Sequence, residues 1–243
     1  MNKIVIITGA SRGIGAATAL TLASQGYKVC VNYRINKSAA NQVVDTIIQQ
    51  GGQAFAHQAD VSQEHEVSEL FLAVDRQFGC ITHLVNNVGI LFPQSKLIDM
   101  DAQRINKILT TNVTSYFLCC KEAIKRMQAG SAIVNVSSGA ARSGSANEYI
   151  DYAASKGAVE TLTKGLSIEL AAQGIRVNCV RPGFIHTDIH RDGGEPNRVA
   201  RLRPHIPMQR GGTAEEVAKA IAWLLSADAS YTTGTFVDVT GGK

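Results

Sequence analysis

The amino-acid sequence predicts one α/β domain, a doubly wound parallel sheet of about seven strands with helices on both faces. Two observations lead to this fold class. Short apolar runs rich in β-branched residues alternate with segments of helical periodicity along the whole chain. No change of composition, repeat or low-complexity tract divides it, so residues 1–243 are expected to form a single unit. A domain of this size can bury a large core without disulfide bonds.

The elements follow from these patterns in chain order. Strands are predicted at residues 3–8, 27–33, 53–57, 82–86, 131–137, 175–181 and 235–239. Helices are predicted at about 13–25, 38–50, 63–77, 101–128, 152–172 and 213–226. Thr213 and Glu216 have the spacing of a capping box for the last helix. Glycines 26, 51, 52 and 174 lie where helix C-caps are expected. The irregular segment 184–212 follows a strand end, where it can cover a ligand.

A glycine-rich turn follows the first strand, in the run Ile4-Val-Ile-Ile-Thr8-Gly9-Ala-Ser-Arg12-Gly13-Ile-Gly15. A strand, a glycine turn and a helix start form the layout of a nucleotide phosphate site, because the backbone can approach the phosphates closely. The same letters satisfy G-x-S-x-G, which would make Ser11 a hydrolase nucleophile. That alternative needs a partner such as His186 or His190, neither of which lies in a triad pattern.

Tyr152 and Lys156 stand four residues apart in the run Tyr152-Ala-Ala-Ser-Lys156. On a helix they share one face, about one turn apart. A lysine cation near a phenol stabilises the phenolate and lowers a tyrosine pKa that is otherwise about 10. A tyrosine tuned in this way can exchange a proton with an alcohol at neutral pH. The simpler alternative is a core tyrosine beside a solvated lysine.

Together these residues resemble the short-chain dehydrogenase/reductase family over essentially the whole chain, and the fold that it implies is Rossmann-type. The motifs that carry the resemblance are the turn Thr8–Gly15, Asp60-Val61, Asn86-Asn87-Val88-Gly89, Asn112, Ser138, Tyr152, Lys156 and Arg181-Pro182-Gly183. Val88 replaces the family's alanine, and the interval from Ser138 to Tyr152 is one residue longer than the commonest spacing. The extra residue leaves Ser137 and Ser138 as candidates for the serine that faces the substrate. Ser138 is preferred because it directly follows the predicted strand.

The resemblance implies a hydride-transferring oxidoreductase that acts on a carbonyl or a secondary alcohol. Tyr152 would then be the general acid or base, Ser138 would polarise the substrate oxygen, and Lys156 would lower the tyrosine pKa. Asn112 would anchor a proton-relaying water. Implied cofactor contacts are Gly9, Ser11, Arg12, Gly13, Ile14, Gly15, Tyr33, Arg34, Asp60, Val61, Asn87, Gly89, Tyr152, Lys156, Pro182, Gly183, Ile185 and Thr187. Asp60 has a second reading, as a turn or N-cap residue before Ser62.

The end of the second strand favours NADP over NAD. An NAD-selective site usually has an acidic residue there to bind the ribose diol. The sequence Val31-Asn32-Tyr33-Arg34 has no carboxylate and places Arg34 at this end, with Arg12 in the glycine turn. Guanidinium groups bind phosphate oxygens well, which suits a 2′-phosphate. Both arginines could instead be ordinary surface residues, and NAD use stays possible.

The substrate is expected to be a small molecule, but its identity stays open between 3-oxoacyl reductase-like and glucose 1-dehydrogenase-like members of the family. Pocket contributors are expected among Phe92, Ala140, Tyr149, Phe184, His186 and residues 188–208. A net charge of +4 with interspersed signs implies no nucleic-acid or membrane surface. The five cysteines lack metal-ligand spacing and fit a reducing, cytoplasmic setting. No metal is expected.

Two further expectations concern the ends of the chain. Met1 is followed almost at once by a strand, which leaves no room for a signal peptide. The C-terminal strand 235–239 and the run Thr240-Gly-Gly-Lys243 resemble the segment through which relatives form homotetramers. An alternative function is a non-catalytic sensor that only binds NADP. A degenerate member of that kind would be expected to lack one of the four catalytic residues, and this chain keeps all four.

Overall fold

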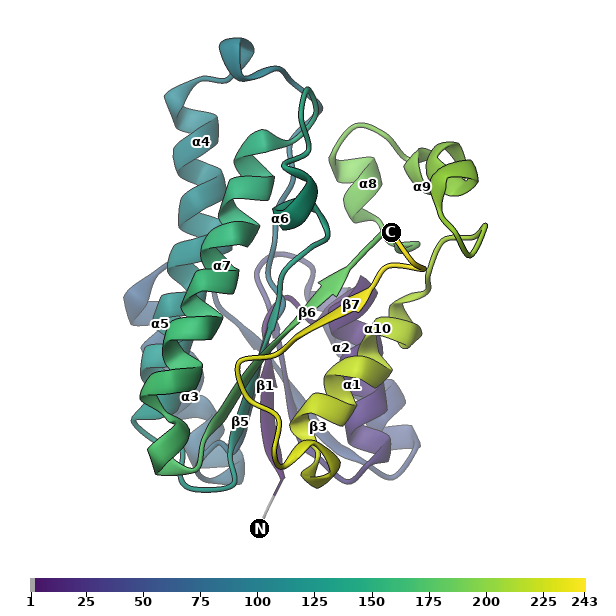
Figure 1. Cartoon of the computed structure of the whole chain (residues 1–243). Helices are drawn as coiled ribbons and strands as arrows, with labels where there is room; N and C mark the ends of the chain where they lie inside the picture. Colours follow the sequence, from purple (N-terminus) through teal and green to yellow (C-terminus); the bar gives the residue numbers. More distant parts are fainter. Residues whose placement is uncertain (1–2) are drawn as a thin grey trace.

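Seven parallel strands form one sheet in the order β3-β2-β1-β4-β5-β6-β7 in the computed structural model, which describes residues 3–243 (Figure 1). The strands are β1 Ile4–Ile7, β2 Lys28–Tyr33, β3 Gln53–Gln58, β4 His83–Asn86, β5 Ala132–Val136, β6 Arg176–Pro182 and β7 Phe236–Val239. Each predicted strand is confirmed to within one residue at either end. The winding reverses at β1, which pairs with both β2 and β4. A ligand crevice is expected at such a reversal, beyond the carboxyl ends of the strands.

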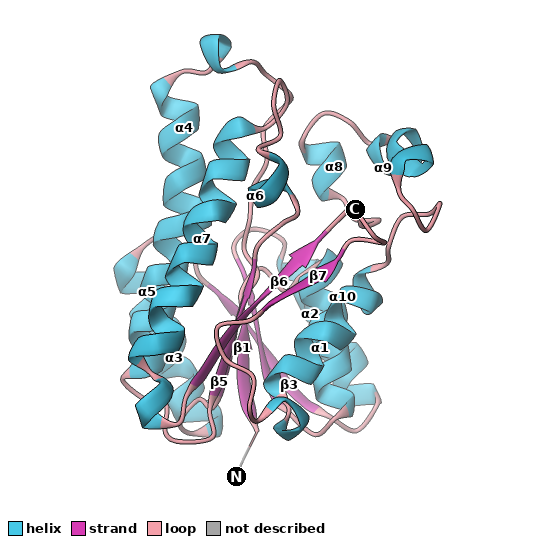
Figure 2. Cartoon of the chain, in the orientation of Figure 1, coloured by secondary structure: helices cyan, strands magenta, loops and turns pink. Residues whose placement is uncertain are grey.

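Helices cover both faces of the sheet (Figure 2). One layer holds α1 Gly13–Ser24, α2 Lys37–Gln49 and α10 Ala214–Leu225, and the other holds α3 Glu64–Phe78, α5 Ser115–Ile124 and α7 Ile150–Glu169. Along β1, Val5 and Ile7 belong to the core under the first layer, while Ile4 and Ile6 belong to the core under the second. This alternation follows from the strand period of two. Each face of the sheet therefore has its own apolar core, as the predicted fold class requires.

The helix predicted over 101–128 is not continuous, so that prediction is wrong in part. Helix α4 ends at Leu109, a π-helical turn spans Thr110–Thr114, and α5 follows. Asn112 lies in this turn, fully buried, and its side chain pairs with the backbone of Ile90. Ile90 belongs to another segment of the chain, so this tertiary contact accompanies a helix distortion of the kind often found at functional sites.

Residues 184–212 contain short helices that the sequence pattern did not predict. They are α8 Ile189–Asp192, α9 Arg198–Leu202 and a 3₁₀ turn at Arg203–His205. A further short helix, α6 Ala140–Ser143, follows β5. Figure 1 shows α8 and α9 near the ends of β6 and β7, on the side where the strands end. The capping box of Thr213 and Glu216 is confirmed at the start of α10.

Candidate active site

The glycine turn between β1 and α1 has a backbone that only glycine adopts easily. Gly9 and Gly13 have φ angles of +63° and +55°. A Cβ atom on Gly15 would lie 2.6 Å from the carbonyl oxygen of Gly9, so a side chain there would force the turn open. Arg12 is the N-cap of α1 and makes no side-chain cap, which leaves the first N–H groups of the helix for an anion. The turn thus fits a dinucleotide pyrophosphate.

Asn87, which directly follows β4, forms hydrogen bonds with this turn from the neighbouring strand. Its Nδ2 donates to the carbonyl oxygens of Thr8 at 2.9 Å and Gly9 at 3.2 Å, and its backbone N–H donates to Thr8 Oγ1 at 2.9 Å. Two residues further on, a Cβ on Gly89 would lie 3.4 Å from Lys156 Nζ. The Asn86–Gly89 segment therefore connects the phosphate turn with the lysine of α7.

The end of β2 presents no acidic side chain to the crevice. Asn32 is buried, and its Oδ1 accepts a hydrogen bond from Gly9 N–H at 3.3 Å. Arg34 forms an ion pair with Asp60 at 3.5 Å. Asp60 also accepts hydrogen bonds from Ser62, at 3.0 Å from the backbone N–H and 2.6 Å from the hydroxyl, which confirms its turn role. Burial raises the pKa of Asp60, but these hydrogen bonds and the Arg34 charge outweigh it and hold the pKa below its usual value.

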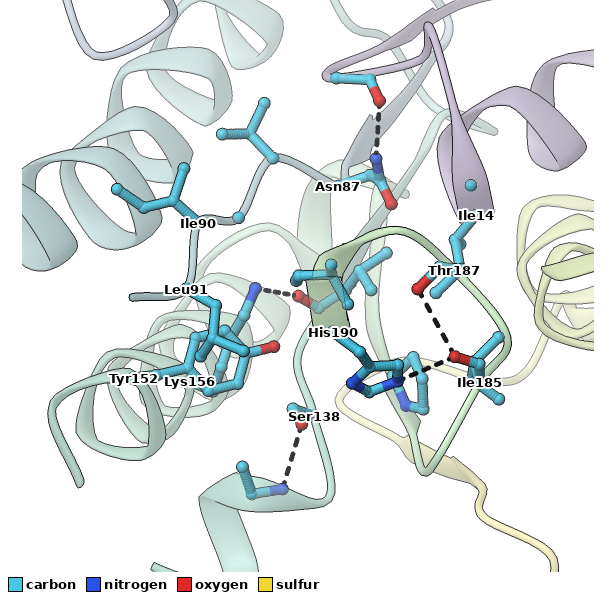
Figure 3. A pocket seen from close by; sticks show the side chains of 18 of the residues that line it. Ile14, Asn87, Ile90, Leu91, Ser138, Tyr152, Lys156, Ile185, Thr187 and His190 are labelled. Carbon is cyan, nitrogen blue, oxygen red and sulfur yellow. Dashed lines mark hydrogen bonds between the residues drawn. The ribbon is translucent and has the colours of Figure 1, made fainter. Parts of the chain in front are cut away.

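Helix α7 and the end of β5 bring the predicted chemical groups together. Figure 3 shows Tyr152 and Lys156 on one side of a cavity and Ile185 and Thr187 on the other, with Ser138 between them. Lys156 is only 2% exposed, and its Nζ donates to Val136 O at 2.8 Å and Tyr116 Oη at 3.2 Å.

Burial sets the pKa values of the tyrosine and the lysine in this arrangement. Desolvation lowers the pKa of Lys156 to about 8. Desolvation also raises the pKa of Tyr152, and the hydrogen bond with Ser138 acts in the opposite direction. The expectation that Lys156 brings the tyrosine pKa down is therefore wrong for the arrangement seen here. The ammonium is hydrogen-bonded to Val136 O, and it lies 5.7 Å from the centre of the Tyr152 ring.

The two candidate serines have different surroundings. Ser137 is buried, and its Oγ donates to Glu160 Oε1 at 2.9 Å and to the carbonyl oxygen of Lys156 at 3.2 Å. Ser138 is half-buried, and its Oγ accepts from Ala140 N–H at 3.1 Å while interacting with Tyr152. Ser137 is thus fully engaged with α7, whereas Ser138 faces the tyrosine.

A cavity of about 830 Å³ extends along these groups. All but two of the predicted site residues line it, namely Gly9, Ser11, Arg12, Gly13, Ile14, Tyr33, Arg34, Asp60, Val61, Asn87, Gly89, Ser138, Tyr152, Lys156, Pro182, Gly183, Ile185 and Thr187. The two exceptions are Gly15, which packs beneath the turn, and Asn112, whose side chain bonds to Ile90 and to Ser155 Oγ. One continuous space therefore runs from the glycine turn to the tyrosine.

The far end of the cavity differs in part from the sequence-based expectation. Ala140, Tyr149, Phe184 and Arg198 line it as expected. Phe92 and His186 do not. The lining also includes residues that the sequence did not suggest, namely Ile90, Leu91, Arg142, Ser145, Glu148, Asp238 and Lys243. These residues come from five separate segments, and no local motif marks them.

Arginines in the segment 184–212, and Arg12 which contacts it, are largely neutralised by aspartate and glutamate side chains. Arg198 is buried and pairs with Glu148 at 2.5 Å and with Glu195 at 3.0 Å. Its guanidinium also lies 4.8 Å from the ring centre of Tyr149. Arg12 forms an ion pair with Asp192 and a longer one, at 3.9 Å, with Asp188. The segment is thus tied to the glycine turn at one end and to the loop before α7 at the other.

Residues 3–243 contain neither a metal-ligand cluster nor a membrane-spanning helix. No cluster of three or more His, Cys, Asp or Glu side chains in this range has the arrangement needed to hold a metal ion. None of the helices described there is both long enough and apolar enough to cross a membrane.

Known proteins resemble this chain over nearly its full length. The family model described as Enoyl-(Acyl carrier protein) reductase matches residues 9–243. The uncharacterized oxidoreductase YgfF of Escherichia coli (strain K12) is 60% identical over 245 residues, covering 99% of both chains. The 3-oxoacyl-[acyl-carrier-protein] reductase FabG of Staphylococcus epidermidis is 39% identical over 244 residues, which is 100% of this chain and 99% of FabG.

Solved structures show the same architecture. A mutant of the Serratia marcescens short-chain dehydrogenase/reductase has a TM-score of 0.93 and 32% identity, covering 99% of this chain and 97% of its own. A short chain dehydrogenase from Burkholderia cenocepacia J2315, in complex with NADP, has a TM-score of 0.93 and 33% identity with the same coverage. The chain therefore belongs to the short-chain dehydrogenase/reductase family and is an NAD(P)-dependent oxidoreductase that transfers hydride.

Proposed function

We propose that this enzyme transfers a hydride between NADP(H) and a carbonyl or secondary alcohol, using Ser138, Tyr152, Lys156 and Asn112. The observation that carries the proposal is the single cavity that joins the glycine turn to Ser138 and Tyr152. When bound, the nicotinamide supplies or accepts the hydride, and the protein must move the proton and hold the substrate oxygen.

Tyr152 is the group that moves this proton. Burial raises its pKa, so the phenol stays protonated near neutral pH and can donate to a developing alkoxide. Ser138 lies against Tyr152 and can donate a second hydrogen bond to the same oxygen. In the direction of alcohol oxidation, the same phenol must first lose its proton.

Lys156 and Asn112 belong to the proton path that serves Tyr152. With its pKa at about 8, the buried lysine can gain or release a proton near neutral pH. Asn112 fixes the backbone of Ile90, which lines the cavity, and holds Ser155 Oγ on α7 at 3.2 Å. We assign it a place in the proton path at the π-helical turn. Its side chain also connects the wall of the cavity to the helix that carries Tyr152.

The preference for NADP rests on the charges that line the adenosine end of the cavity. Arg12 and Arg34 both line it, and the end of β2 has no carboxylate to bind a free ribose diol. Each arginine has a carboxylate partner that a 2′-phosphate would have to displace or share. NADP is therefore the preferred cofactor, and NAD is accepted with lower affinity.

The proposal extends to the class of substrate and to the cellular compartment of the enzyme. The substrate is a small molecule, and the 39% identity to a 3-oxoacyl-[acyl-carrier-protein] reductase makes 3-oxoacyl thioesters the first compounds to assay, ahead of aldoses. All five cysteines are free, and all but Cys80 are buried, which supports a reducing, cytoplasmic setting.

Tyr152→Phe tests the central assignment. The variant keeps the ring but removes the proton that the reaction needs, so turnover of NADPH with any accepted carbonyl should fall by about a thousandfold or more. The dissociation constant for NADPH, measured by fluorescence titration, should stay within about twofold of the wild-type value because the phosphate turn is untouched. A variant that turns over at the wild-type rate would remove Tyr152 from the mechanism.

A further inference from the structure

Four charged side chains from four elements form a continuous network beside Ser138. Glu160 of α7 holds the Arg181 guanidinium in a two-point pair, with Oε1 to Nε at 2.6 Å and Oε2 to Nη2 at 2.7 Å. Arg181, on β6, reaches Asp238 of β7 at 3.5 Å. Asp238 in turn accepts a hydrogen bond from Arg142 of α6 at 2.8 Å. The network therefore joins α7, β6, β7 and α6.

The core of this network is shielded from solvent. The side chains of Glu160 and Arg181 are 16% and 15% exposed, and the guanidinium stacks 4.4 Å from the centre of the Phe236 ring. The hydrogen bond with Glu160 is the first cause by which the pKa of Arg181 rises above its usual value, and the charge of Glu160 adds to it against the opposing effect of burial. A two-point arginine–carboxylate pair also fixes the relative orientation of its partners. This geometry makes Glu160 and Arg181 a rigid link between α7 and β6.

Two sets of hydrogen bonds connect the network to the residues on either side of Ser138 and to its hydroxyl. On one side, the preceding residue, Ser137, donates its hydroxyl proton to Glu160 Oε1 at 2.9 Å and to the carbonyl oxygen of Lys156 at 3.2 Å. On the other side, Ser138 Oγ accepts from Ala140 N–H at the start of α6, and Arg142 of the same helix is paired with Asp238. Glu160 and Lys156 belong to α7, the helix that carries Tyr152, so the hydrogen bonds of Ser137 connect the residue before Ser138 to that helix.

We propose that Glu160 is a positioning residue, which acts through Ser137 to hold Ser138 at hydrogen-bonding distance from Tyr152. The inference rests on the proposed function, because it assigns Ser138 and Tyr152 to the reaction. Within residues 3–243, Glu160 does not line the cavity and forms no hydrogen bond with Ser138 or Tyr152. Its effect is therefore on the geometry of the two reacting groups. A small misplacement of such groups costs about 10- to 100-fold in rate.

A double-mutant cycle on Glu160 and Ser137 tests the proposal. Ser137→Ala removes the connecting hydroxyl and leaves the ion pair of Glu160 with Arg181 intact. Glu160→Leu removes the carboxylate itself. Each single variant should lower kcat by about tenfold, and the double variant should lose no more than about twofold beyond Glu160→Leu alone. The KM and dissociation constant for NADPH should change by less than about twofold in all three, since the phosphate turn is elsewhere.

Two controls separate positioning from general damage to the fold. Glu160→Gln keeps an oxygen that can accept from Ser137, so it should recover most of the kcat lost in Glu160→Leu. Glu122→Leu breaks an ion pair of similar burial, with Arg126, that does not line the cavity. It should lower the thermal midpoint as Glu160→Leu does while leaving kcat unchanged. All variants are assayed with NADPH and whichever diketone, 3-oxoacyl thioester or aldose the wild-type enzyme reduces fastest.

The double variant and the two controls each have an outcome that would overturn the proposal. Losses of kcat that multiply in the double variant would show that Glu160 and Ser137 act independently, and would overturn the proposal. So would a Glu160→Gln variant as impaired as Glu160→Leu, or a Glu122→Leu variant that loses as much kcat. Tyr152→Phe measured in parallel reports on the proposed function itself. If it retained the wild-type rate, the reaction assignment would fail, whatever the Glu160 variants showed.

Discussion

Lys156 is a buried cation of the site, and its hydrogen bonds go to a backbone carbonyl and a phenol rather than to a carboxylate. Burial without an opposite charge disfavours the ammonium, which is why the pKa of Lys156 falls to about 8. A lysine with this pKa releases its proton more readily near neutral pH than an ordinary lysine does. The same property that suits a proton path therefore lowers the stability of the fold.

This coupling predicts a pH-dependent stability. Below pH about 8, both the folded and unfolded chains carry the Lys156 proton, and the cost of burying the charge is fully present. Between about 8 and 10.5, the unfolded chain keeps a proton that the folded chain has released, so the free energy of unfolding rises with pH. The wild type should thus gain up to about 3 kcal/mol relative to Lys156→Met from pH about 7 to about 10.

Urea unfolding of the enzyme at both pH values measures this difference. Lys164→Met, at an exposed position on the same helix, serves as the matched control and should show no comparable gain. If the stability difference between the wild type and Lys156→Met is the same at both pH values, the lysine is not desolvated as described.

Local motifs predicted most of the residues that line the candidate site, because such motifs mark strand ends and glycine turns, which meet at one edge of the sheet. Ser138 and Tyr152 belong to such motifs. Glu160, Glu148 and Asp238 were not predicted, since each acts through side-chain contacts between segments far apart in the sequence. The surroundings of Lys156 were also missed. Its carbonyl partner comes from β5, which a helix pattern cannot show.

At the scale of elements, all seven strands and the six long helical segments were predictable from the apolar periodicity, apart from the interruption in 101–128. That interruption has a long-range partner, since the side chain of Asn112 bonds to Ile90 from another loop. The short helices α8 and α9 contain only a few residues, too few for a periodic pattern. Their ion pairs with Arg12 and Glu148 come from other parts of the chain.

The contact between α8 and the glycine turn leads to a prediction on cofactor affinity. Asp192 neutralises Arg12 in this structure, and a 2′-phosphate would compete with that carboxylate for the guanidinium. Asp192→Asn should therefore tighten NADPH binding by about two- to fivefold, the range expected for an exposed ion pair. NADH binding should be unchanged because NADH lacks the phosphate.

Fluorescence titration with both dinucleotides checks this expectation. Asp228→Asn, an exposed site remote from Arg12 in the sequence and outside the cavity lining, matches the change in net charge. Equal effects on NADPH and NADH, or weaker NADPH binding in Asp192→Asn, would show that Asp192 does not compete with the phosphate.

On the scale of the whole molecule, exposed apolar side chains and a free sheet edge bear on the homotetramer expected from the sequence. Leu109, Phe117 and Ile168 are exposed on or beside α4, α5 and α7, and Trp223 and Tyr231 are exposed on α10 and after it. The edge strand β7 follows Tyr231 in the chain, and nothing pairs with its outer edge in the described sheet. Subunit contacts are expected to cover such apolar side chains, and a tetramer with dihedral symmetry uses two different contacts.

Light scattering should give a mass close to four times the 25.9 kDa of one chain at micromolar concentration. Phe117→Glu should shift the mass to a smaller assembly, because a charge would be buried at the contact. Ile48→Glu, at an exposed site on α2 that carries none of the residues named above, should leave the mass unchanged. A monomer mass for the wild type would contradict the tetramer.

The most direct test of the proposed function follows dinucleotide binding and carbonyl reduction on the same purified protein. NADPH and NADH are titrated by fluorescence, and loss of the reduced-nicotinamide absorbance is then followed with diketones, quinones, 3-oxoacyl thioesters and aldoses. We expect tighter binding of NADPH than of NADH, and NADPH oxidation with at least one carbonyl class. Tight binding without oxidation on any compound would indicate a dinucleotide sensor, and binding of neither dinucleotide would contradict the site itself.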